Sequence, residues 1–139
     1  MRYKAYKYRI YPNREQQELI NKHIGCCRYV YNICLEKKIN AYKTSKKTIS
    51  SFELIKFLPV LKKEQETSFL KEVNSLSLQA SIRNLDSAYQ RFFKEKKGFP
   101  KFKSKRNSRQ SFQIVQNTHV DFDEKKVFIP KFKEGIIIY

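Results

Sequence analysis

The chain has 139 residues, of which 40% are hydrophobic and 14% aromatic. That composition is typical of one folded domain, or of one domain with an insertion, and it excludes a basic disordered tail. The formal net charge is +17, and because so large an excess repels itself unless a polyanion is bound, nucleic acid is the expected partner.

The positive charge is confined to two segments. Residues 1–47 hold 12 basic and 3 acidic side chains and residues 91–109 hold 9 and 1, so these segments carry the whole net charge. Such runs often form only a solvated face, but their confinement here favours a binding surface. No stretch approaches the roughly 18 apolar residues of a membrane-spanning helix. The N-terminus alternates Tyr with Lys and Arg and does not resemble a signal peptide, so we expect a cytoplasmic protein.

Residues 3–11 predict a strand, because Tyr6, Tyr8 and Ile10 alternate with basic residues. One face of this strand can pack while the other presents cations. Pro12 ends the pattern.

A helix is predicted from Asn13 to about Tyr42. Asn13 is placed as its N-cap, and Gln16 completes a capping box. Apolar residues then recur at helical spacing, at Leu19, Ile20, Ile24, Cys27, Tyr31, Cys34 and Leu35. Gly25 lies inside this pattern. It either marks a bend that splits the segment into a helix-turn-helix or lets another backbone come close.

Three cysteines, Cys26, Cys27 and Cys34, are crowded into the same helix, where geometry disfavours disulfides among them. His23 could share a helix face with two of them. There is no Cys-x-x-Cys pair and no fourth ligand at a suitable spacing, so core packing is favoured over a metal site.

The middle of the chain predicts a polar loop at residues 43–48 and then a short helix. Ser50 and Glu53 form another capping-box signature at its start. Pro59 ends or kinks this helix.

The clearest helix runs from about Ser75 to Lys96, with Gly98 as its C-terminal stop. One face predicts a helix-bundle core through an apolar stripe at Leu78, Ile82, Leu85, Tyr89 and Phe92. Polar residues lie off that stripe, at Gln79, Arg83, Asp86 and Gln90.

The segment at residues 98–109 is too basic to be core and predicts an exposed loop, which we call the basic loop. Short strand signals follow, at Ser111 to Gln116, Thr118 to Phe122, Lys126 to Ile129 and Ile136 to Tyr139. A turn is expected at residues 123–125.

The order of strand, helices and strands predicts an α+β fold. We expect residues 1–11 and 110–139 to pair in a small antiparallel sheet or barrel. A helical lobe at residues 12–97, resembling a helix-turn-helix, is then inserted between them.

Catalytic motifs are missing from the sequence. There is no Gly-rich phosphate loop, no nucleophile elbow and no metal motif at diagnostic spacing. The acids are scattered among lysines or gathered at residues 121–124, and solvated charges explain them. We expect no catalytic site in this chain and no cleavage of nucleic acid with Mg²⁺ or Mn²⁺.

Cations interleaved with aromatics are the best candidates for nucleic-acid contacts. Phe99, Phe102 and Phe112 flank five cations, Lys101, Lys103, Lys105, Arg106 and Arg109. Phosphate contacts and base stacking could therefore come from one loop. The first strand repeats the pattern with three cations, which are Lys4, Lys7 and Arg9.

An ordered set of motifs resembles the N-terminal region of TnpB, also called OrfB. TnpB is the transposon-encoded RNA-guided DNA endonuclease related to type V CRISPR effectors. The matching residues cover essentially the whole chain in order: Tyr11-Pro12-Asn13 with Gln17 and Ile20, Gly25-Cys26-x-Arg28-Tyr29-Val30-Tyr31-Asn32 with Leu35, Leu78-Gln79, Leu85-Asp86, Phe92-Phe93, and Gly98-Phe99-Pro100-Lys101-Phe102-Lys103.

The resemblance implies a wedge-like β-barrel interrupted by a helical recognition lobe, in a prokaryotic, nucleoid-associated protein. The family binds a transposon-derived guide RNA and recognises a short adjacent motif in duplex DNA before the guide pairs with its target. Its helix matching residues 74–84 and its first late strand face that duplex, which nominates Ser75, Leu76, Gln79 and Gln113. Gln79 is the strongest candidate because its amide can pair bidentately with adenine. Two further arginines complete the candidate set, Arg28 in the matched motif and Arg83 off the apolar stripe.

The family continues beyond the position of Tyr139 into a RuvC-like nuclease domain with a metal site and a zinc finger. We therefore expect this chain to be the binding half, with no cofactor of its own. Mg²⁺ and zinc would belong to a nuclease part, in the same chain or a separate one. The resemblance leaves three expectations open: an excised piece, a truncated frame or relic without a nuclease, or half of a split effector.

Two rival interpretations remain. A stand-alone helix-turn-helix regulator would use Cys26 to Tyr42 as its recognition helix, whose first turns are mostly aromatic and apolar. That composition argues against it. A structural RNA-binding protein of the ribosomal kind fits the composition but does not explain the ordered motifs.

Overall fold

The computed structural model describes residues 3–106 and 109–138. The first strand, the basic loop and the last strand were predicted to extend onto residues outside these ranges. The described elements are β1 (Ile10–Tyr11), α1 (Arg14–Ser45), α2 (Ser51–Lys63), the 3-10 helix η1 (Gln65–Glu72), α3 (Ser75–Glu95), β2 (His119–Asp121), β3 (Lys126–Phe128) and β4 (Ile136–Ile138).

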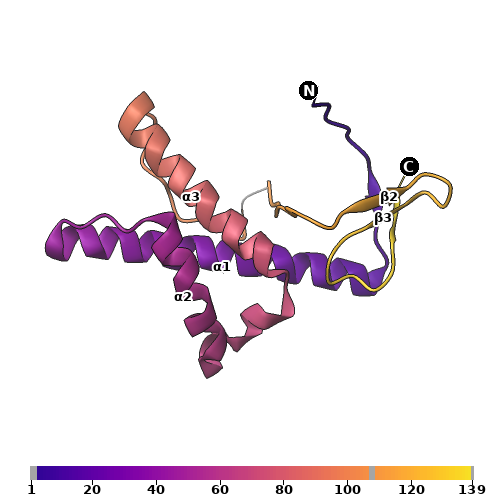
Figure 1. Cartoon of the computed structure of the whole chain (residues 1–139), viewed down its shortest axis with the longest axis horizontal. Coiled ribbons are helices and arrows are strands. Elements are labelled where there is room, and N and C mark those ends of the chain that lie inside the picture. The colour runs from indigo at the N-terminus through magenta and orange to yellow at the C-terminus, as the bar shows by residue number, and fades with distance from the viewer. Residues whose placement is uncertain (1–2, 107–108, 139) are drawn as a thin grey trace.

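The architecture is α+β, with the helices inserted between strands of one sheet. The sheet is antiparallel in the order β1-β4-β3-β2, so the first strand pairs with the last. Figure 1 shows the sheet beside the N-terminal end of α1. Helix α3 crosses α1, and α2 extends away from α1. The predicted insertion of a helical block into a small antiparallel sheet is confirmed.

Helix α1 begins as the sequence predicts. The Asn13 side chain accepts a hydrogen bond from the Gln16 backbone at 2.8 Å, and the Gln16 side chain accepts one from the Asn13 backbone at 2.9 Å. The helix then continues through Gly25 to Ser45 without a turn. A Cβ added at Gly25 would meet only the tip of Arg28, at 3.8 Å, so no neighbouring backbone comes close there.

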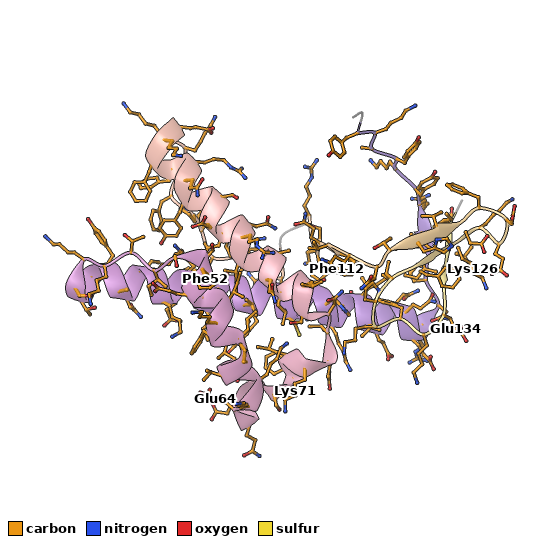
Figure 2. The ribbon with its side chains drawn as sticks, in the orientation of Figure 1. Phe52, Glu64, Lys71, Phe112, Lys126 and Glu134 are labelled. Carbon is orange, nitrogen blue, oxygen red and sulfur yellow. The ribbon has the colours of Figure 1, made fainter. Side chains whose placement is uncertain are left out.

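Gln16 also joins the helical block to the sheet. Its buried amide donates to the Gly135 carbonyl at 3.1 Å, across 119 residues of sequence. Gly135 is crowded, since a Cβ there would lie 2.9 Å from the Lys126 Cβ and 2.9 Å from the Phe128 ring. Figure 2 shows Glu134 and Lys126 at this end of the molecule. The Gln16 amide fixes α1 against the sheet, and a side chain at position 135 would clash with Lys126 and Phe128.

The core lies among α1, α2, η1 and α3. The predicted face of α3 is confirmed, because Leu78, Ile82 and Leu85 are fully buried. Tyr89 and Phe92 continue the stripe but are only partly buried. The three cysteines are buried, free thiols, as expected. Burial raises the pKa of the Cys27 thiol to about 12 and that of Cys34 to about 11, so both stay protonated.

His23 is a buried structural residue that joins α1 to the start of α3. Its Nδ1 bonds to the Leu19 carbonyl at 2.8 Å, and the Asn74 backbone N–H donates to Nε2 at 3.1 Å. Nδ1 must therefore carry the proton of a neutral ring. Burial lowers the pKa of His23, partly opposed by the bond to Leu19. A protonated ring would lose the Asn74 bond, because Nε2 could no longer accept.

Acidification should accordingly destabilise the fold through His23. Below the ordinary histidine pKa of about 6.5, the unfolded chain takes up a proton that the folded chain resists, so the unfolding free energy falls as the pH drops. Urea denaturation at pH about 7.5 and about 5.5 measures this loss. His23→Gln is the control, because glutamine cannot titrate in this pH range and the variant differs from the parent only at this histidine. Equal pH dependence in both proteins would contradict the assignment.

Besides the two expected roles of Gly25, four details of the sequence interpretation are wrong. The first strand spans two residues, because β4 pairs only with Ile10 and Tyr11, and the aromatics before it are exposed. The segment 111–116 forms no strand. Pro59 does not end α2, which was one of its two expected effects: the helix continues to Lys63, since leucines on both sides of the proline are buried, at Leu54, Leu58 and Leu61.

The fourth concerns the end of α3. Lys96, and not Gly98, adopts the left-handed conformation that closes the helix, with φ of 55°. Its backbone N–H donates to the Arg91 carbonyl. A lysine tolerates this conformation at a modest energetic cost, so glycine is not required there.

Candidate nucleic-acid interface

A pocket of about 330 Å³ lies between α1, α3 and the basic loop. Four of the predicted nucleic-acid contacts line it together, Arg28, Lys103, Arg109 and Gln113. Helix α3 contributes further polar lining through Ser77, Ser81 and Asn84. The four predicted contacts lie between positions 28 and 113 of the sequence, yet they meet at one polar pocket. Three of them, Arg28, Lys103 and Arg109, are cations.

The pocket carries amides and hydroxyls as well as cations. Asn84 donates to the Gln113 side chain at 3.5 Å, so two amides stand side by side at the rim. Ser81 donates to the Cys27 carbonyl at 2.8 Å, whereas the buried Ser77 hydroxyl has no hydrogen-bond partner among the described residues. Cations with amide and hydroxyl groups suit a phosphate and sugar backbone.

Asn32 on α1 holds the basic loop against the helices. Its amide donates to the Lys103 carbonyl at 2.9 Å and accepts from the Lys103 backbone N–H at 2.7 Å. The Lys103 ammonium lies 4.4 Å from the centre of the Tyr31 ring, a cation–π distance. The loop backbone is thus fixed at Lys103, although residues 96–103 form no helix or strand.

We expect Asn32→Ala to weaken RNA binding by about 1–2 kcal/mol, because two hydrogen bonds that order the loop are lost. Asn40→Ala is the matched control, since Asn40 is an exposed asparagine on the same helix. Asn32→Asp should be no better than alanine, because a carboxylate cannot donate to the Lys103 carbonyl. Faster hydrogen exchange at the Lys103 amide would show that the effect is one of positioning. Unchanged affinity and exchange in Asn32→Ala would contradict it.

The rest of the basic loop is largely exposed, whereas Phe112 beyond its end is packed. Lys101, Lys105 and Arg106 are exposed, as is Phe102. Phe112 packs against His23, with ring centres 4.9 Å apart, and lies where the loop returns to the helices (Figure 2). Phe102 is 55% exposed, more than Phe99 at 43% and the partly buried Phe112, so it has the ring most accessible for stacking.

The N-terminal cations lie apart from the pocket lining. Lys4, Lys7 and Arg9 are all exposed on an extended segment with no regular structure before β1. Lys4 lies 5.8 Å from the Tyr6 ring, which stacks near Tyr8. Cations on such an extended, exposed segment can follow a nucleic-acid backbone without competing with the fold.

The α3 residues predicted to contact nucleic acid lie on a different side of the helix from the residues that line the pocket. The Ser75 hydroxyl accepts from Lys62 at 3.1 Å. Leu76 and Gln79 are partly buried, and Arg83 is exposed. Gln79 is two positions from Ser77, and residues two apart on a helix do not share a face. Gln79 therefore lies on a different side of α3 from the pocket that Gln113 lines.

Sequence reasoning missed several residues of the interface, among them Asn32 and Asn84. Asn32 belongs to the matched Tyr29-Val30-Tyr31-Asn32 segment, but its partner is 71 positions away. No periodicity signals such a pairing. In the described ranges, no group of three or more His, Cys, Asp or Glu side chains could hold a metal ion. No helix in the same part of the chain is long and apolar enough to cross a membrane.

Comparison with known proteins gives one domain match and several relatives. A family model described as a helix-turn-helix domain, of the OrfB type of IS605 elements, matches residues 1–47. A "Putative RNA-guided DNA endonuclease" of Streptomyces pristinaespiralis is 35% identical over 82% of this chain and 28% of its own length. The "Putative RNA-guided DNA endonuclease InsQ" of Escherichia coli K12 is 31% identical over 94% of this chain and 32% of its own.

A third relative matches this chain over almost the whole of its own length. The "Virulence protein VsdF" of Salmonella dublin is 37% identical over 73% of this chain and 93% of its own length. The chain thus spans less than a third of the two endonuclease relatives and most of the third protein. Together with the ordered motifs, these matches show that the chain belongs to the TnpB/OrfB family and corresponds to its N-terminal region.

Proposed function

We propose that this chain is the nucleic-acid-binding part of a TnpB-like RNA-guided DNA endonuclease. It binds a transposon-derived guide RNA and the adjacent motif in duplex DNA, and it does not cleave by itself. A RuvC-like nuclease part, in the same or a separate polypeptide, supplies the cleavage chemistry, and Mg²⁺ and zinc belong to that part. The observation that carries the proposal is the pocket at which Arg28, Lys103 and Arg109 meet.

The geometry of the basic loop supports this proposal. Asn32 fixes the loop at Lys103, and the exposed cations on either side of that point are then presented from a held backbone. Lysines and arginines displayed in this way bind phosphates of any sequence, which suits a protein that leaves sequence reading to the guide.

The structure does not favour the rival regulator. Its recognition helix would be residues 26–42, whose Val30, Cys34 and Leu35 are completely buried in the core. The same segment lies in the middle of α1, with no turn before it. A recognition helix instead begins after a turn and presents its first residues to the major groove.

Gln79 reads the adjacent motif in this proposal. Its amide can pair with an adenine edge, and loss of such a contact removes roughly 1–3 kcal/mol of discrimination. Gln79→Ala should therefore flatten the motif preference while leaving the overall affinity for nucleic acid nearly unchanged. The measurement is selection from a randomised adjacent-motif library, with guide RNA and the nuclease part supplied.

The matched control is Gln90→Ala, because Gln90 is an exposed glutamine on α3 whose amide bonds to Asp86 within the same helix. Its substitution should not alter the motif preference. If Gln79→Ala keeps both the preference and the affinity of the parent protein, the residue has no role in recognition. If Asn84→Ala flattens the motif preference and Gln79→Ala does not, the amide that reads the motif is that of Asn84 in the pocket.

A further inference from the structure

A second depression, of about 460 Å³, lies between the C-terminal halves of α1 and α3. This is the end of the helical block that lies farther from the sheet (Figure 1). We call it the aromatic groove, and its lining residues are Lys38, Ile39, Tyr42, Lys43, Lys47, Thr48, Ile49, Tyr89, Phe92, Phe93 and Phe99. It shares none of these residues with the pocket beside Arg28. Its volume is within the range of small-ligand sites, roughly 300–1,000 Å³.

Aromatic rings crowd this groove and stay accessible. Phe99 packs edge-on against Tyr89 and Phe92, with ring centres 5.4 and 5.2 Å away. Phe93 is 69% exposed and Tyr42 is 61% exposed. Neither ring is needed to fill the core, so both are open to an incoming planar group.

The groove is also positively charged. Lys43 and Lys47 are exposed lining residues, and among the lining residues in the described part of the chain none is acidic. Lys38 is buried at its floor, donates to the Ile49 carbonyl at 2.6 Å and lies 4.6 Å from the centre of the Tyr89 ring. The Asp86 carboxylate lies 4.0 Å from the Lys38 ammonium, and Glu53 also attracts its charge.

We propose that the aromatic groove binds an unpaired nucleotide of a single strand, with the base against Phe93 and Tyr42 and the backbone phosphate near Lys43 and Lys47. Aromatic faces beside lysines are the combination that holds single-stranded nucleic acid, since every base has a face to stack. A paired base offers no such face, because its neighbours in the duplex cover it. The proposal rests on the proposed nucleic-acid binding and adds a site to it.

Charge argues against the two protein occupants of such a groove. A second copy of this chain would bring a net charge of +17 against +17. An apolar peptide would leave Lys43 and Lys47 without counter-charges. A nucleotide satisfies the rings and the lysines together.

The test uses an RNA oligomer of about 12 nucleotides carrying one central 2-aminopurine, a base whose fluorescence is quenched when it stacks. A DNA oligomer of the same sequence distinguishes the two kinds of single strand. Phe93→Ala and Tyr42→Ala should each weaken binding roughly 5- to 100-fold and reduce the quenching. Phe93→Leu should restore little, because it supplies apolar surface without a ring.

Phe52→Ala is the matched control, since Phe52 is 65% exposed on α2 and lies outside the groove. It should bind and quench as the parent does. Equal binding and quenching by Phe93→Ala and the parent would overturn the proposal, as would an equal loss with a duplex of the same sequence. A parent chain that sediments as a dimer and a Phe93→Ala variant that sediments as a monomer would assign the groove to a second copy.

These outcomes separate the groove from the proposed function. If the parent chain binds neither single strands nor structured RNA, the proposed function itself fails. If the parent binds and the groove variants bind equally well, only the groove assignment fails.

Discussion

Replacing Lys101, Lys103 and Arg106 together by glutamine should weaken binding to every nucleic acid tested. At about 1 kcal/mol for each exposed phosphate contact, the loss is on the order of 100-fold at low salt. The dependence of log K on log salt should flatten by about two to three units, since each lost contact removes one released counterion. Titrations against structured RNA and duplex DNA at several salt concentrations measure both quantities.

The control removes the same charge from another surface. Lys56, Lys63 and Lys71 are exposed on α2 and η1, away from the pocket and the basic loop. Their replacement by glutamine lowers the net charge equally, but the affinity and the salt slope should change far less. If both triple variants lose the same affinity, binding follows net charge and the basic loop has no special place in it. A loss restricted to one DNA sequence would instead assign base reading to the loop.

The helical part of the fold could be predicted from the sequence because its signals are local. Asn13 and Gln16 cap α1 through bonds three residues apart, and the α3 stripe repeats at the period of a helix. These signals correctly predicted that Leu78, Ile82 and Leu85 are buried. Gly25 and Pro59 misled because packing on both sides of each residue maintains the helix.

The strands were harder to predict because their partners are distant. Alternation at residues 3–11 resembled a long strand, but only Ile10 and Tyr11 find a partner in β4. The segment 111–116 alternates similarly and pairs with nothing described, since Phe112 turns toward His23. Alternation identifies a segment that can pair, whereas the register of the other strand decides whether it does.

The sequence predicted several residues of the candidate site but not how they are arranged in space. Arg28, Lys103, Arg109 and Gln113 were selected for charge or for resemblance, and the structure places them around one pocket. The pairing of Asn32 with Lys103 and the aromatic groove both depend on where α1 and α3 cross. That crossing is a property of packing, which no local pattern in the sequence contains.

Leu85→Ala should lower the unfolding free energy by roughly 2–5 kcal/mol, because Leu85 is completely buried where α3 packs on the other helices. Small domains are stabilised by only about 5–15 kcal/mol, so the variant loses a large fraction of its stability. Chemical denaturation followed by far-ultraviolet circular dichroism measures the change. Leu85→Met should cost less than about 1.5 kcal/mol, because it nearly conserves volume.

The position of Leu85 on α3 gives this loss a functional consequence. Ser77, Ser81 and Asn84 line the pocket from one part of the helix, while Tyr89, Phe92 and Phe93 line the aromatic groove from the other. Leu76→Ala is the matched control on α3, since Leu76 is only partly buried and should cost much less. At temperatures where Leu85→Ala remains folded, its affinity for RNA should equal that of the parent, and it should fall only as the variant unfolds. A stability loss below about 1 kcal/mol would contradict the packing of α3, and a folded variant with weak binding would mean that Leu85 shapes the binding surfaces directly.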